Sequence, residues 1–236
     1  MAGPTKASDM SFIGWIWRAI KIVFAFVVAV HVYALALIFV PVPGTLNMSD
    51  RVLQGTDVYY SWAKFDEISP HLVRAVIAAE DTRFCQHAGV DIDAIQSALD
   101  ERRESGRVRG ASTLTQQTAK NVFLWNGGGY ARKGAEAWMA VFIDGFWGKR
   151  RVMETYLNVA EWGDGLYGAE AAAYGRFGKP ARDLNKFEAA RLAAVLPSPN
   201  KWRVNPAGPY VRRRTQTILA RMEVVTRDGL DDCVLD

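Results

Sequence analysis

An uninterrupted apolar run near the N-terminus constrains this chain more than any other feature of its sequence. From Ile22 to Val40 it reads IVFAFVVAVHVYALALIFV, with His31 as its one strongly polar residue. About 19 residues at a helical rise of about 1.5 Å each cross a bilayer core of about 30 Å. A signal peptide would have a shorter apolar region and a small-x-small cleavage site, whereas this run ends at Pro41. The run predicts a retained transmembrane helix over residues 22–40.

The charges that flank this run predict its orientation. The basic residues that precede it are Lys6, Arg18 and Lys21. On the downstream side the first cation is Arg51. Basic residues next to a transmembrane helix favour the cytoplasmic side. We therefore expect residues 1–21 to form a cytoplasmic tail and interfacial segment, and residues 44–236 to form one domain outside the membrane.

Composition limits what the extramembrane domain can be. The chain has 236 residues, of which 50% are hydrophobic and 23% charged, and this excludes a disordered protein. A net charge of +4 suits an anionic membrane surface, a phosphorylated ligand or nucleic acid. Nucleic acid is disfavoured because the cations are dispersed and the domain is expected to face outward. Cys85 and Cys233 are consistent with either one disulfide or two free thiols.

Apolar periodicity after Pro43 is mainly helical, and runs of alternating apolar residues are scarce. We therefore predict one mainly α-helical domain. Its first helix should have Ser69 as N-cap and Pro70 at the first helical position. Further helices are predicted over residues 91–104, 113–124, 132–146, 151–159, 169–174, 187–196 and 210–226.

The segment EDTRFCQHAG, which spans residues 80–89, contains the strongest catalytic candidate. The apolar stripe of the preceding helix continues into Glu80, so a carboxylate stands where the pattern requires an apolar residue. Burial raises the pKa of a carboxyl group and suits it to general acid or base chemistry. From this motif alone, a helix-end glutamate paired with Arg83 or His87 explains the pattern equally well. Asp81 lies off the stripe and is expected to hold the loop that follows.

Two more polar motifs follow. In GASTLTQQTAKN, residues 110–121, we expect Ser112 to cap a helix on which Gln116, Gln117 and Lys120 share one face. Two amides beside a cation suit sugar hydroxyls and a phosphate, although a solvated helix face also explains them.

The motif RKGAE places two cations, Arg132 and Lys133, one turn before Glu136. A surface salt bridge explains it without any function. Alternatively the cations bind a phosphate, and Glu136 orients them or helps to hold a divalent metal. Residues 153–170 and 188–199 are predicted to be mainly structural, as core and as an alanine-rich packing helix.

In their order and spacing, the motifs ED-x-x-F-x-x-H-x-G, G-x-ST-x-TQQ-x-x-KN, RK-x-x-E and E-x-YLN resemble the peptidoglycan glycosyltransferase family. The resemblance runs from about Ser69 to Pro206. It implies a lysozyme-like α-helical fold and an enzyme that polymerises lipid II into β-1,4-linked glycan strands with release of undecaprenyl pyrophosphate. The process it implies is bacterial cell wall biosynthesis.

The resemblance also implies roles for individual residues. Glu80 and Glu136 are the expected catalytic residues: Glu80 would deprotonate the acceptor 4-hydroxyl, and Glu136 matches the second glutamate of the family. The cations that would stabilise the leaving pyrophosphate are Lys120, Arg132 and Lys133. The residues that match positions lining the sugar and phosphate sites are Arg83, Ser112, Gln116 and Gln117.

Partners and location follow from the same resemblance. The expected partners are lipid II, the growing glycan chain, membrane lipid, and other cell-wall synthesis and division proteins. The expected location is the bacterial inner membrane, with a cytoplasmic N-terminus and a periplasmic catalytic domain. We expect no tightly bound cofactor, although Mg²⁺ or Mn²⁺ would suit the pyrophosphate.

Two departures and two alternatives accompany the resemblance. The loop at residues 126–130 lacks an arginine that many relatives have, and Arg176 stands where they usually have an aromatic residue. A lysozyme-like, glycan-cleaving enzyme would share the fold but would not need pyrophosphate-binding cations. A catalytically inactive, membrane-tethered scaffold would not need Glu80, Lys120 or Glu136.

Overall fold

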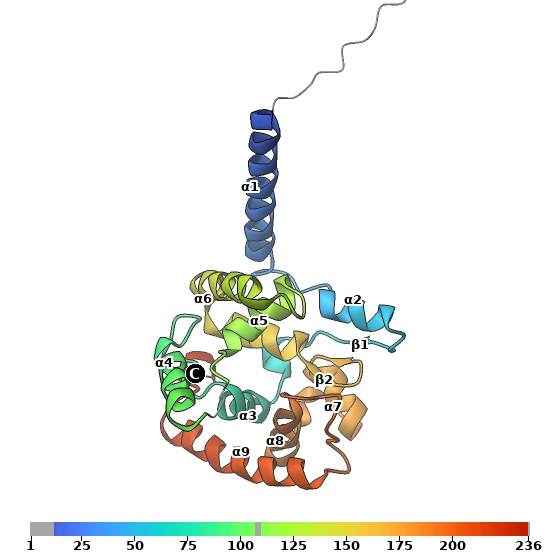
Figure 1. Ribbon diagram of the computed structural model, residues 1–236. Coiled ribbons are helices and arrows are strands. Elements are labelled where there is room, and N and C mark those ends of the chain that lie inside the picture. Colours follow the sequence, from blue (N-terminus) through green and yellow to red (C-terminus); the bar gives the residue numbers. More distant parts are fainter. Residues whose placement is uncertain (1–11, 107–109, 236) are drawn as a thin grey trace, which may run out of the picture. The chain divides into compact units, whose positions relative to one another are not determined.

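The computed structural model describes residues 12–106 and 110–235, which form two compact units divided between Phe39 and Val40. The first unit contains α1 (Phe12–Ala36), which is a single helix (Figure 1). Most of its large apolar side chains are exposed. This helix is long and apolar enough to cross a membrane. It begins before the predicted span of residues 22–40 because the residues from Phe12 onward are also mostly apolar. It ends before Pro41, which lacks the N–H that a continuing helix needs. The first eleven residues of the predicted tail lie outside the described part of the chain.

The second unit is mainly helical, as predicted. Its α-helices are α2 (Leu46–Leu53), α3 (Pro70–Glu80), α4 (Ile92–Ser105), α5 (Leu114–Phe123), α6 (Gly129–Val159), α7 (Ala169–Phe177), α8 (Lys186–Val195), α9 (Pro209–Arg227) and α10 (Asp232–Leu235). Its short 3-10 helices are η1 (Phe65–Glu67) and η2 (Ala181–Asp183).

A small sheet with the strand order β1-β3-β2 completes this unit. Strand β1 (Tyr59–Tyr60) runs parallel to β3 (Leu166–Tyr167), and β2 (Glu161–Gly163) runs antiparallel to β3. In the register Tyr59 pairs with Leu166 and Tyr60 pairs with Tyr167.

Helix α3 is the centre of the core and fixes the position of Glu80 at its C-terminal end. Its apolar residues, including Val73 and Ile77, are completely buried, and α8 and α9 pack against it. Burial of each such side chain contributes about 1.5–3 kcal/mol. Helix α8 is the predicted alanine-rich packing helix, and its small side chains permit close approach to α3. The predicted cap is confirmed: the Ser69 hydroxyl accepts a hydrogen bond from the His71 N–H at 3.3 Å.

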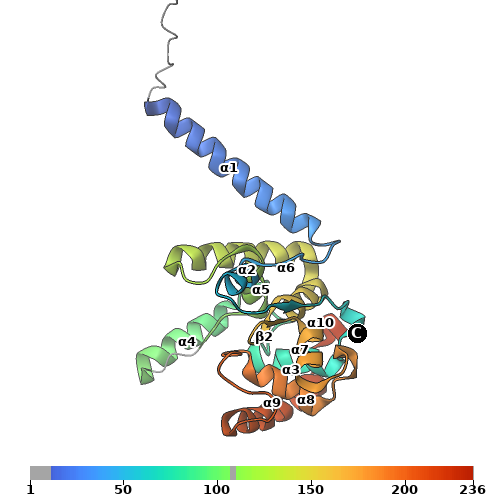
Figure 2. The ribbon, with the colours of Figure 1, turned by 90° about the vertical axis from the view of Figure 1, so that its right-hand side faces the viewer.

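Helix α6 covers two of the predicted helices, 132–146 and 151–159. The break between them is at Gly148, whose φ of 71° is a left-handed conformation that glycine adopts readily. The part before Gly148 contains the RKGAE motif, whereas the part after it is largely buried, including Leu157 and Val159. Figures 1 and 2 show α5 and α6 on one side of α3, with α8 and α9 on the opposite side.

Candidate active site

Glu80 lies in the interior of the second unit, where two other helices reach its carboxylate. Its side chain is 13% exposed. Gln117 of α5 donates a hydrogen bond from Nε2 to Glu80 Oε2 at 3.1 Å, and Arg214 Nη2 of α9 lies 3.5 Å from Oε1. Burial raises the pKa of Glu80, and the Gln117 hydrogen bond and the charge of Arg214 offset only part of this effect. The pKa of Glu80 is therefore raised in the direction that suits general acid or base chemistry.

The raised pKa gives a prediction about stability. Folding favours the neutral form of Glu80, so its contribution to stability is present at low pH and is lost as pH rises through the raised pKa. We expect the Glu80→Gln protein to melt at a higher temperature than the wild type at pH 8. The difference should shrink at pH 4, where the wild-type side chain is also neutral. Thermal melts across this range test the prediction, and a more stable wild type at pH 8 would contradict it.

Asp81 connects the loop after Glu80 to the N-terminus of α5, as the sequence predicts. Its Oδ2 accepts a hydrogen bond from the Leu114 backbone N–H at 2.9 Å and lies 3.0 Å from His87 Nε2. A carboxylate at a helix N-terminus is stabilised by the unpaired N–H groups there. The loop and α5 are therefore held in one arrangement around Glu80.

The predicted cap of α5 is wrong by one residue, and this changes the position of Gln116. Thr113, rather than Ser112, is the N-cap, and its hydroxyl accepts a hydrogen bond from the Gln116 N–H at 3.1 Å. In turn, the Gln116 side-chain oxygen accepts a hydrogen bond from the Thr113 N–H at 3.0 Å. Gln116 is 2% exposed, so its amide belongs to the helix cap and does not share an open face with Gln117.

Three cations and one carboxylate gather between α5 and α6. Arg132 Nη1 lies 2.6 Å from Glu136 Oε2, and Lys133 Nζ contacts the other oxygen of Glu136. The salt bridge considered as the alternative interpretation is present, but Glu136 is 2% exposed, so this pair is not a surface pair. Burial lowers the pKa of Lys120, Glu136 raises it, and the charges of Arg132 and Lys133 lower it further. Because cations outnumber the carboxylate, this cluster suits an anionic ligand.

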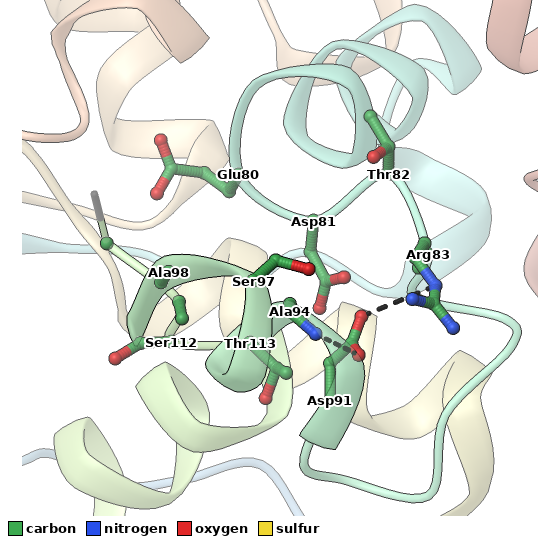
Figure 3. Close-up of a pocket in the computed structure, with 12 residues that line it drawn as sticks. Glu80, Asp81, Thr82, Arg83, Asp91, Ala94, Ser97, Ala98, Ser112 and Thr113 are labelled. Atoms are coloured by element: carbon green, nitrogen blue, oxygen red, sulfur yellow. Dashed lines mark hydrogen bonds and ion pairs between the residues drawn. The ribbon is translucent and has the colours of Figure 1, made fainter. Parts of the chain in front are cut away.

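Two cavities adjoin Glu80 and the cation cluster. Glu80, Arg83 and Ser112 line the first, a space of about 240 Å³ that Figure 3 shows in close-up. Ser112 accepts a hydrogen bond from Lys133 Nζ at 2.8 Å, which connects this cavity to the cation cluster. Arg83 points away from Glu80 and pairs with Asp93 at 2.7 Å, so it does not contact the carboxylate.

Gln117 lines the second cavity and donates a hydrogen bond to Glu80, which lines the first. The second cavity, of about 260 Å³, is lined by residues that include Gln117, Lys120 and Tyr156. Tyr156 belongs to the buried stretch predicted as core, and its hydroxyl donates to Gln117 Oε1 at 3.3 Å. Tyr156 thereby orients the amide that holds Glu80.

A family model for transglycosylases matches residues 48–223. The chain belongs to the transglycosylase family. Among similar proteins, the biosynthetic peptidoglycan transglycosylase of Rhodospirillum centenum is 53% identical over 199 residues, which cover 84% of this chain and 86% of the relative. That of Caulobacter vibrioides is 53% identical over 209 residues, covering 88% and 89%. That of Pseudomonas aeruginosa is 46% identical over 211 residues, covering 87% and 91%.

These findings confirm the family resemblance and the enzyme class. The chain is a peptidoglycan transglycosylase that polymerises glycan in cell wall synthesis. Glu80 at the end of a buried helix and the cation cluster on α5 and α6 both lie within the residues that the family model matches.

Arg214 of this transglycosylase was not predicted as a site residue, because α9 was predicted as a helix without any functional assignment. Three cationic residues follow one another at positions 212–214, and that run was the available signal. Only the packing of α9 against α3 shows which of them reaches Glu80.

The two departures from the family pattern have local structural accounts. In the loop before α6, Gly128 has a φ of 85°, and a Cβ there would lie 2.9 Å from the Cβ of Arg132. Arg132 Nε also donates to the Gly127 carbonyl, so this glycine loop fixes a cation of the cluster. The guanidinium of Arg176 lies against Gly163 and leaves no room for a side chain there.

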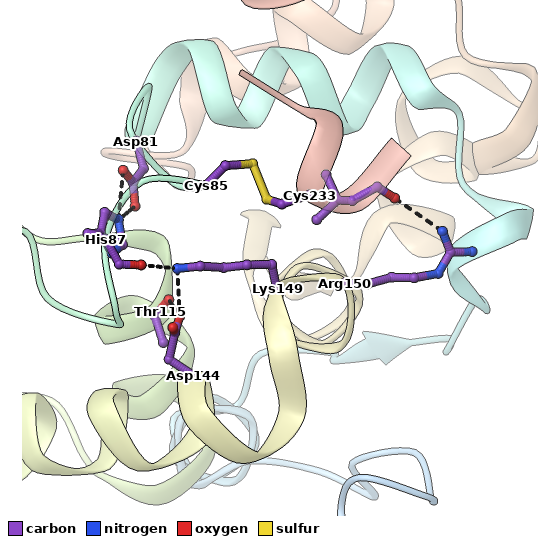
Figure 4. The surroundings of a disulfide bond; sticks show 9 residues. Asp81, Cys85, His87, Thr115, Asp144, Lys149, Arg150 and Cys233 are labelled. Carbon is purple, nitrogen blue, oxygen red and sulfur yellow. Dashed lines mark hydrogen bonds and ion pairs between the residues drawn. A yellow bond between two sulfur atoms is a disulfide. The ribbon is translucent and has the colours of Figure 1, made fainter. Parts of the chain in front are cut away.

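A disulfide joins Cys85, in the loop after Glu80, to Cys233 of α10, which decides between the two states left open by the sequence (Figure 4). Lys149 lies near this disulfide (Figure 4). Its Nζ is 2.7 Å from Asp144 Oδ1 and 2.6 Å from the His87 carbonyl oxygen. The loop is therefore held at Cys85 by a covalent bond and at His87 by hydrogen bonds.

Proposed function

We propose that this transglycosylase polymerises lipid II into β-1,4-linked strands and releases undecaprenyl pyrophosphate. The observation that carries the proposal is the juxtaposition of a buried glutamate with a cation cluster linked to the same cavity. Glu80 supplies a base, and Lys120, Arg132 and Lys133 supply positive charge for a phosphorylated leaving group.

The reaction is one displacement in which Glu80 takes a proton. The 4-hydroxyl of the acceptor sugar loses its proton to the Glu80 carboxylate as its oxygen attacks the anomeric carbon of the donor. The bond from that carbon to the pyrophosphate oxygen breaks, and its electron pair leaves with the pyrophosphate. Attack from the face opposite the leaving group inverts the configuration and gives the β linkage. The proton on Glu80 is then released to solvent.

Glu136 acts in this proposal as a positioning residue. Both of its oxygens contact cations, so it holds Arg132 and Lys133 in place and does not take up a proton from the acceptor. Lys133 in turn contacts Ser112 at the edge of the Glu80 cavity. The cluster is thereby preorganised before the pyrophosphate arrives, which is how fixed charges lower a barrier most effectively.

The membrane location is proposed from four features. Helix α1 is compatible with a single-pass membrane anchor. We propose a bacterial inner membrane with the N-terminus cytoplasmic, because the basic residues precede the helix. The disulfide supports a periplasmic domain, since disulfides persist in oxidising compartments. The exposed apolar side chains of Trp138, Val141 and Phe146 on α6 suit contact with lipid.

The residues of the site do not fit a resident divalent ion. In the described residues, no group of three or more His, Cys, Asp or Glu could hold a metal. The oxygens of Glu136 contact Arg132 and Lys133, and those of Glu80 face Gln117 and Arg214. We propose that Mg²⁺ or Mn²⁺ enters only on the pyrophosphate of the substrate.

Metal removal tests this proposal. We expect EDTA to leave the melting temperature unchanged and to slow polymerisation without stopping it, because the three cationic side chains remain in place. Thermal melts and polymerisation assays with and without the chelator measure both effects. A lower melting temperature in EDTA would show that the protein itself holds a structural ion.

Incubation with fluorescent lipid II tests the proposed function directly. We expect long, lysozyme-sensitive glycan strands. Shortening of preformed strands without polymer would favour the glycan-cleaving alternative, and the absence of either product would favour an inactive scaffold. Association with other cell-wall synthesis and division proteins stays a prediction of the family resemblance.

A further inference from the structure

A third cavity adjoins Glu80 through Arg214, along a side of α9 where the exposed Arg213 and Arg221 flank the buried Ile218. It has a volume of about 240 Å³ and is bounded on one side by Ala79, the residue before Glu80. The residues of α9 that line it are Tyr210, Arg213, Arg214, Thr217, Ile218 and Arg221. Their spacing of three, four and seven residues places them along one side of the helix.

The charge in this cavity is positive and largely uncompensated. Arg214 faces Glu80, but within the described part of the chain no carboxylate forms an ion pair with Arg213 or Arg221. The arrangement therefore favours an anionic ligand, and guanidinium groups bind carboxylates and phosphates with two parallel hydrogen bonds.

Two stacked aromatic rings, Tyr210 and Trp202, lie at the edge of this cavity. The ring of Trp202 stacks on Tyr210, with centroids 3.9 Å apart and an interplanar angle of 26°. This stack fixes Tyr210 at the edge of the cavity. An apolar wall next to cations suits an organic anion, which presents carbon atoms as well as charge.

The position of the cavity distinguishes between the anionic groups of the substrate. The cations assigned to the pyrophosphate are on α5 and α6, and Figures 1 and 2 show α9 on the opposite side of α3. The same α6 exposes the apolar side chains proposed to face lipid, where a lipid-linked pyrophosphate must be. A sugar bound at Glu80 would thus direct its pyrophosphate toward α5 and α6. The peptide attached to the same sugar would then face α9.

We propose that the α9 cavity is a subsite for a carboxylate of the peptide that the sugar substrate carries. The inference rests on the proposed function, because it assumes a lipid-linked sugar peptide at Glu80. Arg213 and Arg221 bind the carboxylate, the Tyr210–Trp202 stack packs against the peptide carbon atoms, and Arg214 connects this subsite to the base.

A double variant tests the subsite and leaves Arg214 and Glu80 unchanged. We expect Arg213→Gln with Arg221→Gln to raise KM about three- to tenfold for lipid II with free peptide carboxylates, and to leave kcat close to that of the wild type. Lipid II with amidated carboxylates should have a raised KM with the wild type, and the variant should raise it no further. A matched control, Arg102→Gln with Arg182→Gln, removes two exposed cations from α4 and η2 and should leave KM unchanged.

Two outcomes would overturn the assignment. An equal rise in KM for the free and amidated substrates would show that the arginines bind a phosphate, and no rise would show that the cavity is not a subsite. Substrate binding to Glu80→Gln protein, with and without the two arginine changes, gives the same comparison without turnover. Failure of the subsite is therefore distinguishable from failure of the wild type to polymerise, which would instead contradict the proposed function.

Discussion

Replacement of Glu80 by glutamine is expected to lower the rate of polymerisation by about 10²- to 10⁴-fold. Glutamine has nearly the same shape, and its one amide oxygen can still accept a hydrogen bond from Gln117 or from Arg214. It has no carboxylate to accept the proton of the acceptor hydroxyl, so the loss is chemical and not structural. The measurement is the initial rate of strand formation from fluorescent lipid II, in single-turnover and steady-state conditions.

The control for this experiment is Glu104→Gln, which removes one exposed carboxylate from α4. It should polymerise like the wild type. The wild-type rate should also fall on the acid side at a pH above the usual range for glutamate, because the raised pKa of Glu80 sets where the base becomes protonated. Equal rates from Glu80→Gln and the wild type would remove Glu80 from the role of base.

Loss of the Cys85–Cys233 disulfide is expected to destabilise the fold by about 2–5 kcal/mol. The bond joins residues 148 apart in the sequence, so it restricts a large part of the unfolded chain. For a domain of this size we expect the melting temperature to fall by about 5–15 °C. Thermal melts of the oxidised protein, the reduced protein and the Cys85→Ser, Cys233→Ser double variant measure the effect.

The three samples separate the covalent bond from other effects of a reductant. The double variant should melt near the reduced protein and should not respond to reductant. Cys85 is half-buried and Cys233 is exposed, so a mild reductant can reach the bond. If the oxidised and reduced proteins melt together, noncovalent contacts hold α10 in place. These include the hydrogen bond from Arg150 to the Val234 carbonyl and the ion pair between Arg74 and Asp231, the residue before α10.

The sequence predicted those parts of the fold and site that depend on local patterns. The apolar stripe ending in Glu80 predicted a buried carboxylate because helix periodicity determines which residues face the core. Ser69-Pro70 predicted the start of α3 because a cap and a proline both act within one turn. The same kind of reasoning predicted that Asp81 would hold the loop after Glu80.

Other parts depend on which segments meet in space, and local patterns did not predict them. Ser112 was predicted as the cap of α5, and only the reciprocal bonds between Thr113 and Gln116 show that Thr113 takes this position. Arg214 reaches Glu80 because α9 packs on α3, a contact between residues 134 positions apart in numbering. The pairing of Cys85 with Cys233 depends on the position of α10 in the same way.

The position of α10 has a practical consequence for protein production. The family match ends at residue 223, before the end of α9 and before all of α10. A recombinant fragment cut at that boundary would lack Cys233, and the thiol of Cys85 would then be available for oxidation between molecules. It would also lack Asp231, the ion-pair partner of Arg74 on α3. Expression fragments that extend through Leu235 should therefore give monodisperse material, whereas those cut at residue 223 should form reductant-sensitive dimers on non-reducing gels.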